Sequence, residues 1–388
     1  MDFELTDEQR GIVDSTRSLL ATKFPVETAR NLIDTAHGFD PELWRRGTEL
    51  GWPALGVAED DGGLGLQTVE LTLVAAELGR GLGCVPFLPV VVAADALGQS
   101  DHAHRSALLP AICEGTAIAT WAFAEFGRPW SADGIAARAQ RGPDGFTLTG
   151  SKVSVQDADS AQVLIVDAVA DTGPARFVVP ADAPGIRIER QKTLDVTRSY
   201  CDVSFDQVRL DASALISDGD GARDAIARSL LLNTVLTCAE MVGIGERLLA
   251  MTTEYVKDRV QFGRPVGSFQ AVKHKCANMR IWSQASTAAT YYAAMALDAA
   301  HPQADRAVSI AKAYVSDAVN RIAGEALQLH GGIGFTWEHD LHLYLRRARV
   351  DAMLSGDAAH HRELLCQSIE TGRRDVNRCA AGAQRCGD

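Results

Sequence analysis

The sequence lacks an excess of positive charge, a long apolar run and a leader-like start. Its 38 Lys and Arg residues against 50 Asp and Glu give a formal net charge of -12, so no basic surplus is available to neutralise a nucleic-acid backbone. The closest approach to an apolar run, residues 86–97, is shorter than the roughly 20 residues that a membrane helix needs. The first ten residues, MDFELTDEQR, resemble neither a secretory signal nor a transit peptide. We therefore expect a cytoplasmic protein with no nucleic-acid partner and no membrane span.

Patterns for metal, disulfide and nicotinamide chemistry are also missing. The eight cysteines include no Cys-x-x-Cys pair, which in a long chain is typical of reduced thiols rather than a zinc site. His339 and His342 share a helix face without a matching carboxylate ligand, so we interpret them as surface residues and expect no metal. Gly243-Ile-Gly245 lacks the third glycine of a dinucleotide fingerprint and lies in a helical pattern, which argues against a nicotinamide enzyme.

Three regions with different sequence patterns follow one another along the chain. Residues 1–115 carry helix signals, including a capping box at Thr6 and Gln9 and a helix start at Asp40-Pro41. Residues 116–215 consist of short alternating runs broken by Gly, Pro and Asp, which predict a small antiparallel β barrel or sandwich.

Helical patterns return after residue 215. Residues 216–372 carry long amphipathic segments, which predict a four-helix bundle. Residues 373–388 are rich in Arg, Gly and Ala without an apolar period, and we expect a flexible tail. The bundle helices are expected at 222–259, 269–299, 303–329 and 339–371.

Four segments carry a family resemblance. Two are short, at residues 41–65 and 150–152, and two are specific: RVQFGRPVGSFQ at 259–270 and QLHGGIGFTWEHD at 328–340. Together with the helical, β and helical-bundle layout, they make the chain similar to the acyl-CoA dehydrogenases up to its tail. The resemblance implies a mainly α fold with a β middle domain, an FAD cofactor, an acyl-CoA substrate and an oligomer.

The two specific segments have a physical interpretation. Arg259 ends a long helix and precedes a chain reversal at Gly263 and Pro265, where its guanidinium can fork onto a diphosphate. Gln328 precedes adjacent glycines that let the backbone approach a ligand closely. In the family, such elements bind the ADP half of an FAD that is held mainly by a neighbouring subunit. The alternative interpretation is that the glycines only cap a helix and that Arg259 only pairs with an acid. By this resemblance, the cofactor-binding residues are Arg259, Gln270, Gln328, Gly331 and Gly332.

The chain departs from the family at the catalytic base. Acyl-CoA dehydrogenases remove an α proton from the thioester with a carboxylate while the flavin takes the β hydride. Most members carry that carboxylate in a Tyr-Glu-Gly-Thr loop, where this chain has Leu-Ser-Gly-Asp and Ser355 stands at the base position. Other members carry it on the first bundle helix, where this chain has Asn233. Neither side chain takes a proton at neutral pH.

Substitutes for the base remain open. Asp357, Asp351 and Glu240 lie near these positions in sequence or on the same helix face, but each is more simply a surface or capping acid. Residues that would hold the flavin ring also differ, at 124–126, 129–131 and 154–156. Asp195, Arg198 and Ser199 are further candidates for the border of the acyl chain.

The chain lacks the family's catalytic base but keeps the residues expected to bind the ADP half of FAD. This combination suggests a partner-type subunit of a heteromeric acyl-CoA dehydrogenase, of the kind that degrades steroids in bacteria. A homologous second chain would supply the base and the ring contacts, and an electron-transfer flavoprotein or similar acceptor would take the electrons. The alternatives are a catalytic homotetramer that uses Asp357 or Glu240, and an interaction protein on the same fold. The identity of the acyl chain is not encoded in any motif.

Overall fold

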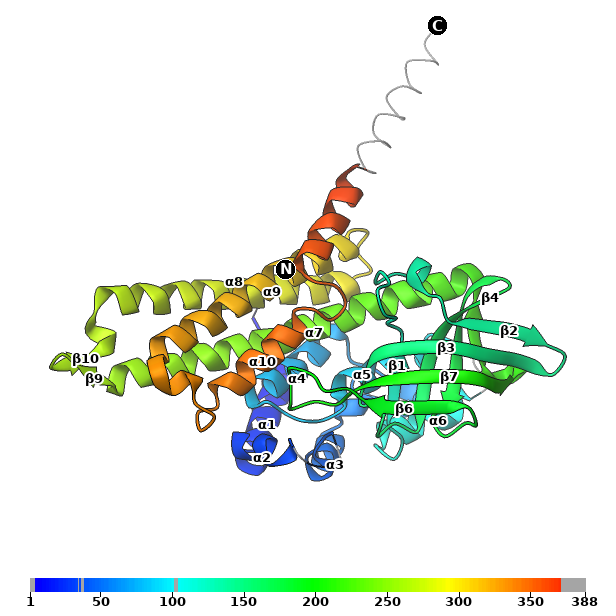
Figure 1. The fold of residues 1–388 in the computed structure, drawn as a ribbon, viewed down its shortest axis with the longest axis horizontal. Coiled ribbons are helices and arrows are strands. Elements are labelled where there is room, and N and C mark those ends of the chain that lie inside the picture. The colour runs from blue at the N-terminus through cyan, green and yellow to red at the C-terminus, as the bar shows by residue number, and fades with distance from the viewer. Residues whose placement is uncertain (1–3, 34, 36–37, 101–103, 371–388) are drawn as a thin grey trace, which may run out of the picture.

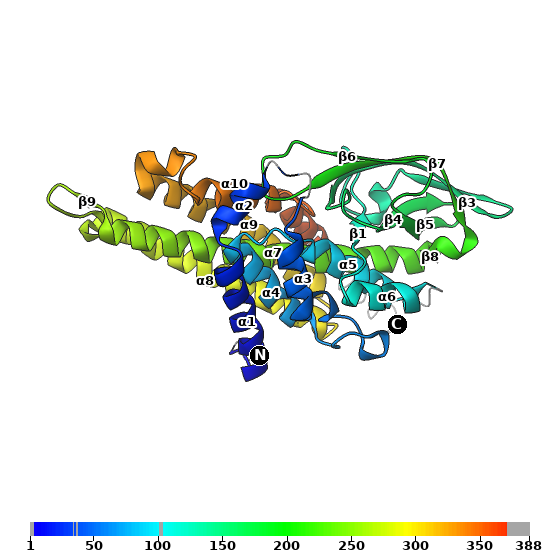
Figure 2. The ribbon, with the colours of Figure 1, turned by 90° about the horizontal axis from the view of Figure 1, so that it is seen from below.

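The computed structural model describes residues 4–33, 35, 38–100 and 104–370. The molecule is elongated: a β sheet lies at one end of the long axis and a small hairpin, β9–β10, at the other (Figures 1 and 2). Helices of the two α-helical parts lie between them. This separation of the two ends matters for the cofactor-binding residues described below.

The first part of the chain is helical, as expected. Thr6 and Gln9 form the expected capping box, and the Asp40 carboxylate accepts a hydrogen bond from the Leu43 backbone N–H at the second helix start. Such side-chain bonds satisfy backbone donors that the first helical turn leaves open. The helices are α1 (Asp7–Lys23), α2 (Val26–Leu32), α3 (Pro41–Glu49), α4 (Thr68–Gly81), α5 (Phe87–Gly98) and α6 (Arg105–Cys113).

The middle part is one sheet of eight strands, with β6, β7, β3, β2, β4, β5 and β8 side by side and β1 paired to β4. The expected β domain is confirmed, but the sheet is mixed rather than wholly antiparallel, because β1 and β2 both pair with β4 in parallel. Buried and exposed residues alternate along β7, as in a strand with one face on the core. The strands are β1 (Ala119–Ala122), β2 (Arg138–Gly142), β3 (Gly145–Gln156), β4 (Val163–Ala170), β5 (Gly173–Pro180), β6 (Ile186–Arg190), β7 (Tyr200–Asp211) and β8 (Leu215–Asp218).

The last part is a bundle of long helices. The elements are α7 (Gly219–Asp258), β9 (Val260–Gln261), β10 (Arg264–Pro265), α8 (Gln270–Asp298), α9 (Ala304–His330) and α10 (Leu341–Asp351). A further helix runs over 358–370. The expectation of one continuous helix over 339–371 is therefore wrong, because the chain leaves the helix at 352–357, where Ser355 and Gly356 have positive φ angles of 57° and 96°.

Close helix packing explains the Gly243-Ile-Gly245 pattern. Both glycines lie inside α7, as the helical pattern indicated. A Cβ at Gly243 would lie 1.8 Å from the Ala76 carbonyl oxygen of α4, and one at Gly79 would lie 2.0 Å from the Glu240 carbonyl oxygen. The α4–α7 crossing thus requires glycine on both helices.

Helix α7 is long and apolar enough to cross a membrane by length and composition. However, 67% of its apolar window is buried inside the protein. One hydrophobic core runs through the two helical parts and a second lies within the β sheet. The Arg176 guanidinium, ion-paired to Asp167, also donates to Ser229 of α7 at 3.0 Å and so fixes the sheet to the bundle.

Candidate functional site

The residues expected at the two family base positions, Asn233 and Ser355, meet in space although 122 residues separate them. Asn233 comes from the middle of α7, and Ser355 from the turn between α10 and helix 358–370. The Asn233 Nδ2 donates to Ser355 Oγ at 2.8 Å, and only 2% of Ser355 is exposed. His361 Nε2 lies 3.0 Å from the Ser355 carbonyl oxygen. The pair forms a neutral amide–hydroxyl contact, which has no group that accepts a proton near pH 7.

Two cavities flank this contact, and Trp130 lines both. The inner cavity has a volume of only about 50 Å³ and is bounded by Phe123, Ser154, Tyr200 and Asn233, among others. The outer pocket has a volume of about 370 Å³ and reaches Ser355 from the other side. Within the inner cavity, the Phe123 and Trp130 rings lie 6.0 Å apart between centroids. Two aromatic rings thus line this small cavity.

Two of the three substitute acids named from the sequence, Glu240 and Asp357, already have polar partners within the chain. Glu240 is fully buried and pairs with the guanidinium groups of Arg198 and Arg347, the second at 3.4 Å. Asp357 accepts a hydrogen bond from the His360 backbone N–H at 2.8 Å and so caps helix 358–370. The structure therefore gives each acid a structural contact of its own.

A buried ionic cluster lies at the junction of the three parts of the chain. Arg347 of α10 donates to the Gly83 carbonyl of the first part at 3.2 Å and to Thr197 Oγ1 beside the sheet at 2.6 Å. It also pairs with Asp195 at 3.3 Å. Since a guanidinium that is fully buried needs such partners, Arg347 fixes the position of α10 against the rest of the molecule.

Two carboxyl groups in this region hold protons more strongly than usual. Burial, reinforced by the nearby Glu240, raises the pKa of Asp351 well above its ordinary value, and within the described residues neither carboxyl oxygen has a hydrogen-bond partner. Burial also raises the pKa of Asp157 to about 7, although Arg198 opposes the shift. Arg198 and Arg347 offset the charges of Glu240 and Asp195. Asp351 and Asp157 are therefore left without a full counter-charge.

The other sequence candidates near the acyl chain lie in or beside this cluster. Asp195, Arg198 and Ser199 are buried, but they are not among the residues that line either cavity. Tyr200 does line the inner cavity, and its buried hydroxyl has no partner among the described residues. The sequence offered no signal for Tyr200 beyond its position next to the candidates.

The loop after β1 is held by an ion pair inside the sheet. Lys152 is fully buried, and its Nζ donates to Glu125 at 2.7 Å and to the Phe123 carbonyl at 3.1 Å. Glu125 also accepts the Ala137 backbone N–H at 3.0 Å. The adjacent Phe126 is 91% exposed. The loop is thus anchored at Glu125, while its aromatic neighbour contacts solvent.

The five cofactor-binding candidates are all exposed and lie in the bundle. Arg259 is the C-cap of α7 and leads into the hairpin β9–β10, at the end of the molecule away from the sheet (Figures 1 and 2). Gln270 begins α8, and Gln328 lies in the last turn of α9, before Gly331 with its left-handed φ of 62°. A Cβ at Gly332 would meet no atom of this chain within 4 Å. Packing within the chain therefore does not require that glycine.

Exposed apolar side chains surround these candidates. Phe262 is 91% exposed in the hairpin, and Phe335 and Trp337 are 75% and 52% exposed in the segment after α9. Large apolar groups gathered at one end of a molecule mark a contact surface.

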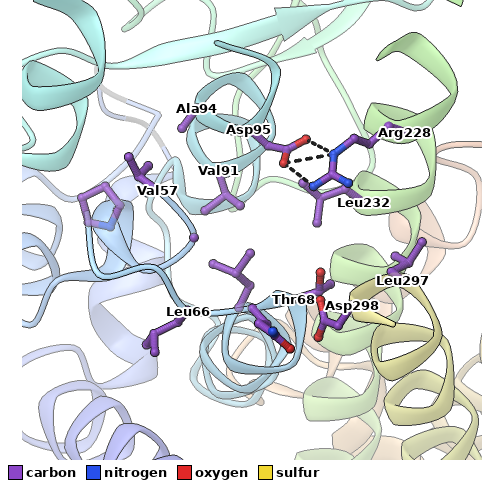
Figure 3. A pocket seen from close by; sticks show the side chains of 14 residues that line it. Val57, Leu66, Thr68, Val91, Ala94, Asp95, Arg228, Leu232, Leu297 and Asp298 are labelled. Atoms are coloured by element: carbon purple, nitrogen blue, oxygen red, sulfur yellow. Dashed lines mark hydrogen bonds and ion pairs between the residues drawn. The ribbon is translucent and has the colours of Figure 1, made fainter. Parts of the chain in front are cut away.

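A further pocket of about 210 Å³ lies between α5, α7 and the loop at 53–68. Figure 3 shows the Asp95 carboxylate and the Arg228 guanidinium paired at its edge, with Val91 and Leu232 along its walls. Asp298 at the end of α8 accepts the Thr68 backbone N–H at 2.8 Å. Asp95 and Arg228 neutralise each other, and the Asp298 carboxylate already accepts two backbone N–H groups, so these charged groups are engaged within the protein.

Comparison with known proteins places the chain. Residues 6–116 match the family model for the acyl-CoA dehydrogenase N-terminal domain, and residues 219–370 match that for the C-terminal domain. The acyl-CoA dehydrogenase IpdE2 of Mycolicibacterium smegmatis is 30% identical over 91% of this chain and 96% of its own length.

Solved structures agree with this placement. The ChsE4-ChsE5 complex from Mycobacterium tuberculosis gives a TM-score of 0.88 at 28% identity, over 95% of this chain and 99% of that one. The Tcur3481-Tcur3483 steroid ACAD gives a TM-score of 0.87 at 28% identity over the same shares. The chain belongs to the acyl-CoA dehydrogenase family.

Proposed function

We propose that this protein is the base-lacking subunit of a heteromeric FAD-dependent acyl-CoA dehydrogenase. One observation carries the proposal: the ADP-binding candidates are exposed at the end of the molecule away from the sheet, while the cavity beside Asn233, which Phe123 and Trp130 line, has a volume of only about 50 Å³. The chain would complete a flavin site whose ring contacts and base come from a homologous second chain. A CoA ester derived from a steroid or another lipid is the proposed substrate, in line with the steroid relative above.

The residues present fit one half of FAD and not the other. Arg259 offers a guanidinium with no ion pair among the described residues, and Gly331 and Gly332 offer an exposed backbone, which suits a diphosphate. The inner cavity of about 50 Å³ is far below the roughly 300 Å³ at which small-molecule pockets begin. It has no room for a three-ring flavin head beside Phe123 and Trp130.

The position of the ADP-binding candidates supports binding between chains. Arg259 and the hairpin β9–β10 lie at the end of the long axis opposite the sheet (Figure 1). They therefore cannot reach a flavin placed at the sheet of the same molecule. The exposed Phe262, Phe335 and Trp337 give this end the apolar surface that a stable subunit contact needs.

The chemistry would then be divided between two chains. Bound FAD supplies the hydride acceptor, and the second chain's carboxylate takes the α proton. This chain's own residues bind and orient the cofactor: Arg259 and the glycines hold the diphosphate of FAD. The Ser355–Asn233 contact takes no part in proton transfer. An electron-transfer flavoprotein or a similar protein is the proposed electron acceptor.

Contacts in the buried cluster weigh against a homotetramer with a displaced base. Glu240 pairs with two arginines, and Asp357 caps a helix. A carboxylate that serves as base must be free to meet the substrate's α proton at hydrogen-bond distance. Neither of these two acids is free in this way. The third, Asp351, is only 1% exposed and lines neither of the cavities beside the Asn233–Ser355 contact.

Complementation between variants tests the proposal. The chain is co-expressed with a homologous subunit that carries the family glutamate, and acyl-CoA oxidation is measured with an artificial electron acceptor. Changing the partner's glutamate to glutamine should abolish turnover and leave FAD bound, whereas Arg259→Ala in this chain should lower FAD content. A matched change at the exposed Arg187 of the sheet should alter neither. If Glu240→Gln or Asp357→Asn in this chain stops turnover while FAD stays bound, the proposal is wrong.

A further inference from the structure

Three histidines lie in or beside the segment at 331–340, which contains the two glycines among the cofactor-binding candidates. His330 is the last residue of α9, His339 lies near the end of the segment, and His342 lies in the first turn of α10. The expectation that His339 and His342 are surface residues on one helix face is wrong, because both are half-buried and His339 lies before α10 begins. These histidines are therefore part of the packing around the segment.

The three imidazole rings pack against other rings. His330 stacks on Tyr255 of α7 with 4.5 Å between ring centroids, and the His339 ring meets it edge-on at 4.7 Å. His342 stacks on Trp337 at 4.4 Å. Such ring contacts are favourable at these distances, and they connect the segment to α7 on one side and to α10 on the other.

In two of the rings, one nitrogen is hydrogen-bonded and the other is buried without a partner. His330 Nδ1 lies 2.8 Å from the Ala326 carbonyl oxygen, and His342 Nε2 lies 3.2 Å from the Trp337 carbonyl oxygen. Since a carbonyl only accepts, these two nitrogens carry the proton of a neutral imidazole. The opposite nitrogens, His330 Nε2 and His342 Nδ1, are buried and have no hydrogen-bond partner among the described residues.

A second proton on His330 would place a charged N–H in a buried position that has no acceptor. Burial lowers the pKa of His330; the contact with the Ala326 carbonyl opposes the shift, and the neighbouring His339 adds to it. Tyr255 and His339 are the titratable groups that contact this ring from other elements within the described part of the chain, and neither is a carboxylate. The folded protein therefore favours the neutral His330 ring.

The charges around His342 also favour its neutral form. Burial lowers the pKa of His342, the Trp337 carbonyl opposes the shift, and Arg30 and Arg346 add to it. Asp340 favours the charged ring, but its carboxylate is already paired with Arg30 at 2.8 Å. His342 thus resembles His330 in its hydrogen bonds and in the direction of its shift.

We infer that His330 and His342 are positioning residues, which hold the segment at 331–340 in place while their rings are neutral and release it when they are protonated. The link to FAD rests on the proposed function, in which Gly331 and Gly332 bind the diphosphate. Because the folded segment disfavours the charged rings, it binds protons less tightly than the released segment. The hold is therefore fully present above about pH 6.5, the ordinary pKa of histidine, and is lost as pH falls through the lower pKa of the folded state.

Hydrogen–deuterium exchange of the purified full chain tests the hold itself. Backbone amides at 331–340 are followed at pH 7.5 and pH 5.5, and their rates are corrected for the intrinsic effect of pH on exchange. The corrected exchange of this segment should rise at least about three-fold at pH 5.5, whereas amides at 236–244, buried within α7, should not change. No rise at 331–340 would overturn the inference.

Variants that cannot titrate assign the effect to the two histidines. The double variant His330→Asn and His342→Gln keeps an N–H donor at each hydrogen-bonded position, so its exchange at 331–340 should not depend on pH. His342→Gln alone should show a smaller rise than the wild type, which gives a second test if the double variant does not fold. The exposed His301 between α8 and α9 is the matched control, and His301→Gln should keep the full rise. An equal rise in all variants would overturn the inference.

FAD binding by the mixed complex tests the link to the cofactor. The dissociation constant of FAD, from fluorescence titration of the apo-complex, should rise about three-fold or more from pH 7.5 to pH 5.5 in the wild type. In the double variant it should change less than about two-fold. Release of the segment without a change in FAD affinity would reject the positioning role. If the mixed complex takes up no FAD, the proposed function fails, whereas the exchange measurements still decide whether the histidines hold the segment.

Discussion

Asp157 gives the most quantitative prediction about the domain junction. It lies at the end of β3 with only 2% of its surface exposed, in a left-handed backbone conformation with φ of 53°. Its pKa is raised to about 7, chiefly by burial, with Asp159 adding to the shift and Arg198 opposing it. Asparagine adopts the left-handed region readily, so Asp157→Asn removes the charge without straining the backbone.

The sign follows from the direction of the shift. Because the pKa is higher in the folded state than its ordinary value of 3.8, the folded protein binds the proton more tightly. The stability that this tighter proton binding by Asp157 contributes is fully present below about pH 4 and is lost as pH rises through about 7. A pKa unit is worth about 1.4 kcal/mol, so the ionised group costs about 4 kcal/mol at pH 8 and about 1.5 kcal/mol at pH 5.

Urea unfolding of wild type and Asp157→Asn at pH 5 and pH 8 measures this difference. The variant should gain stability at both values, and the gain should be larger at pH 8 by about 2–3 kcal/mol. Asp206→Asn, at an exposed position of the same sheet, is the matched control and should show no such dependence. An equal effect of Asp157→Asn at the two pH values, or a loss of stability that grows with pH, would refute the reasoning.

Three further outcomes are expected. Arg347→Met should cost about 3–5 kcal/mol in the free energy of unfolding, because it leaves the buried Asp195 without its guanidinium and Glu240 with that of Arg198 alone; a change below about 1 kcal/mol in urea titrations would contradict this. Arg259→Ala should weaken FAD binding in the mixed complex about ten-fold or more, through loss of a charge-assisted contact, and fluorescence titration of the apo-complex measures it. Ser355→Glu should give the isolated chain no acyl-CoA oxidation, because the flavin ring has no space beside it; measurable turnover would count against the filled cavity.

Local signals predicted much of the fold. The capping box at Thr6 and the Asp40-Pro41 start were readable because each depends on residues within one turn. The starts of the long bundle helices followed from their apolar period. The break at 352–357 was missed because the apolar pattern continues through it, and Gly356 is the one local sign of a turn. The parallel pairing of β1 and β2 with β4 was missed because it joins segments that are distant in sequence.

The candidate site was predictable only where a family motif marks it. Ser355 and Asn233 were named from two separate motifs, and their contact at 2.8 Å makes the two assignments consistent in space. The roles of Glu240 and Arg347 could not be predicted, since a buried arginine has the same local pattern as an exposed one. The sequence around Trp130 also gave no sign that this residue lines two cavities, because its position depends on how the loop after β1 packs against α7.

The flavin content of the purified chain, alone and mixed with a glutamate-bearing homologue, tests the central claim most directly. The account predicts almost no flavin absorbance for the chain alone and one FAD for each pair of unlike chains in the mixture. One FAD per chain in the protein purified alone, together with oxidation of an acyl-CoA, would contradict it.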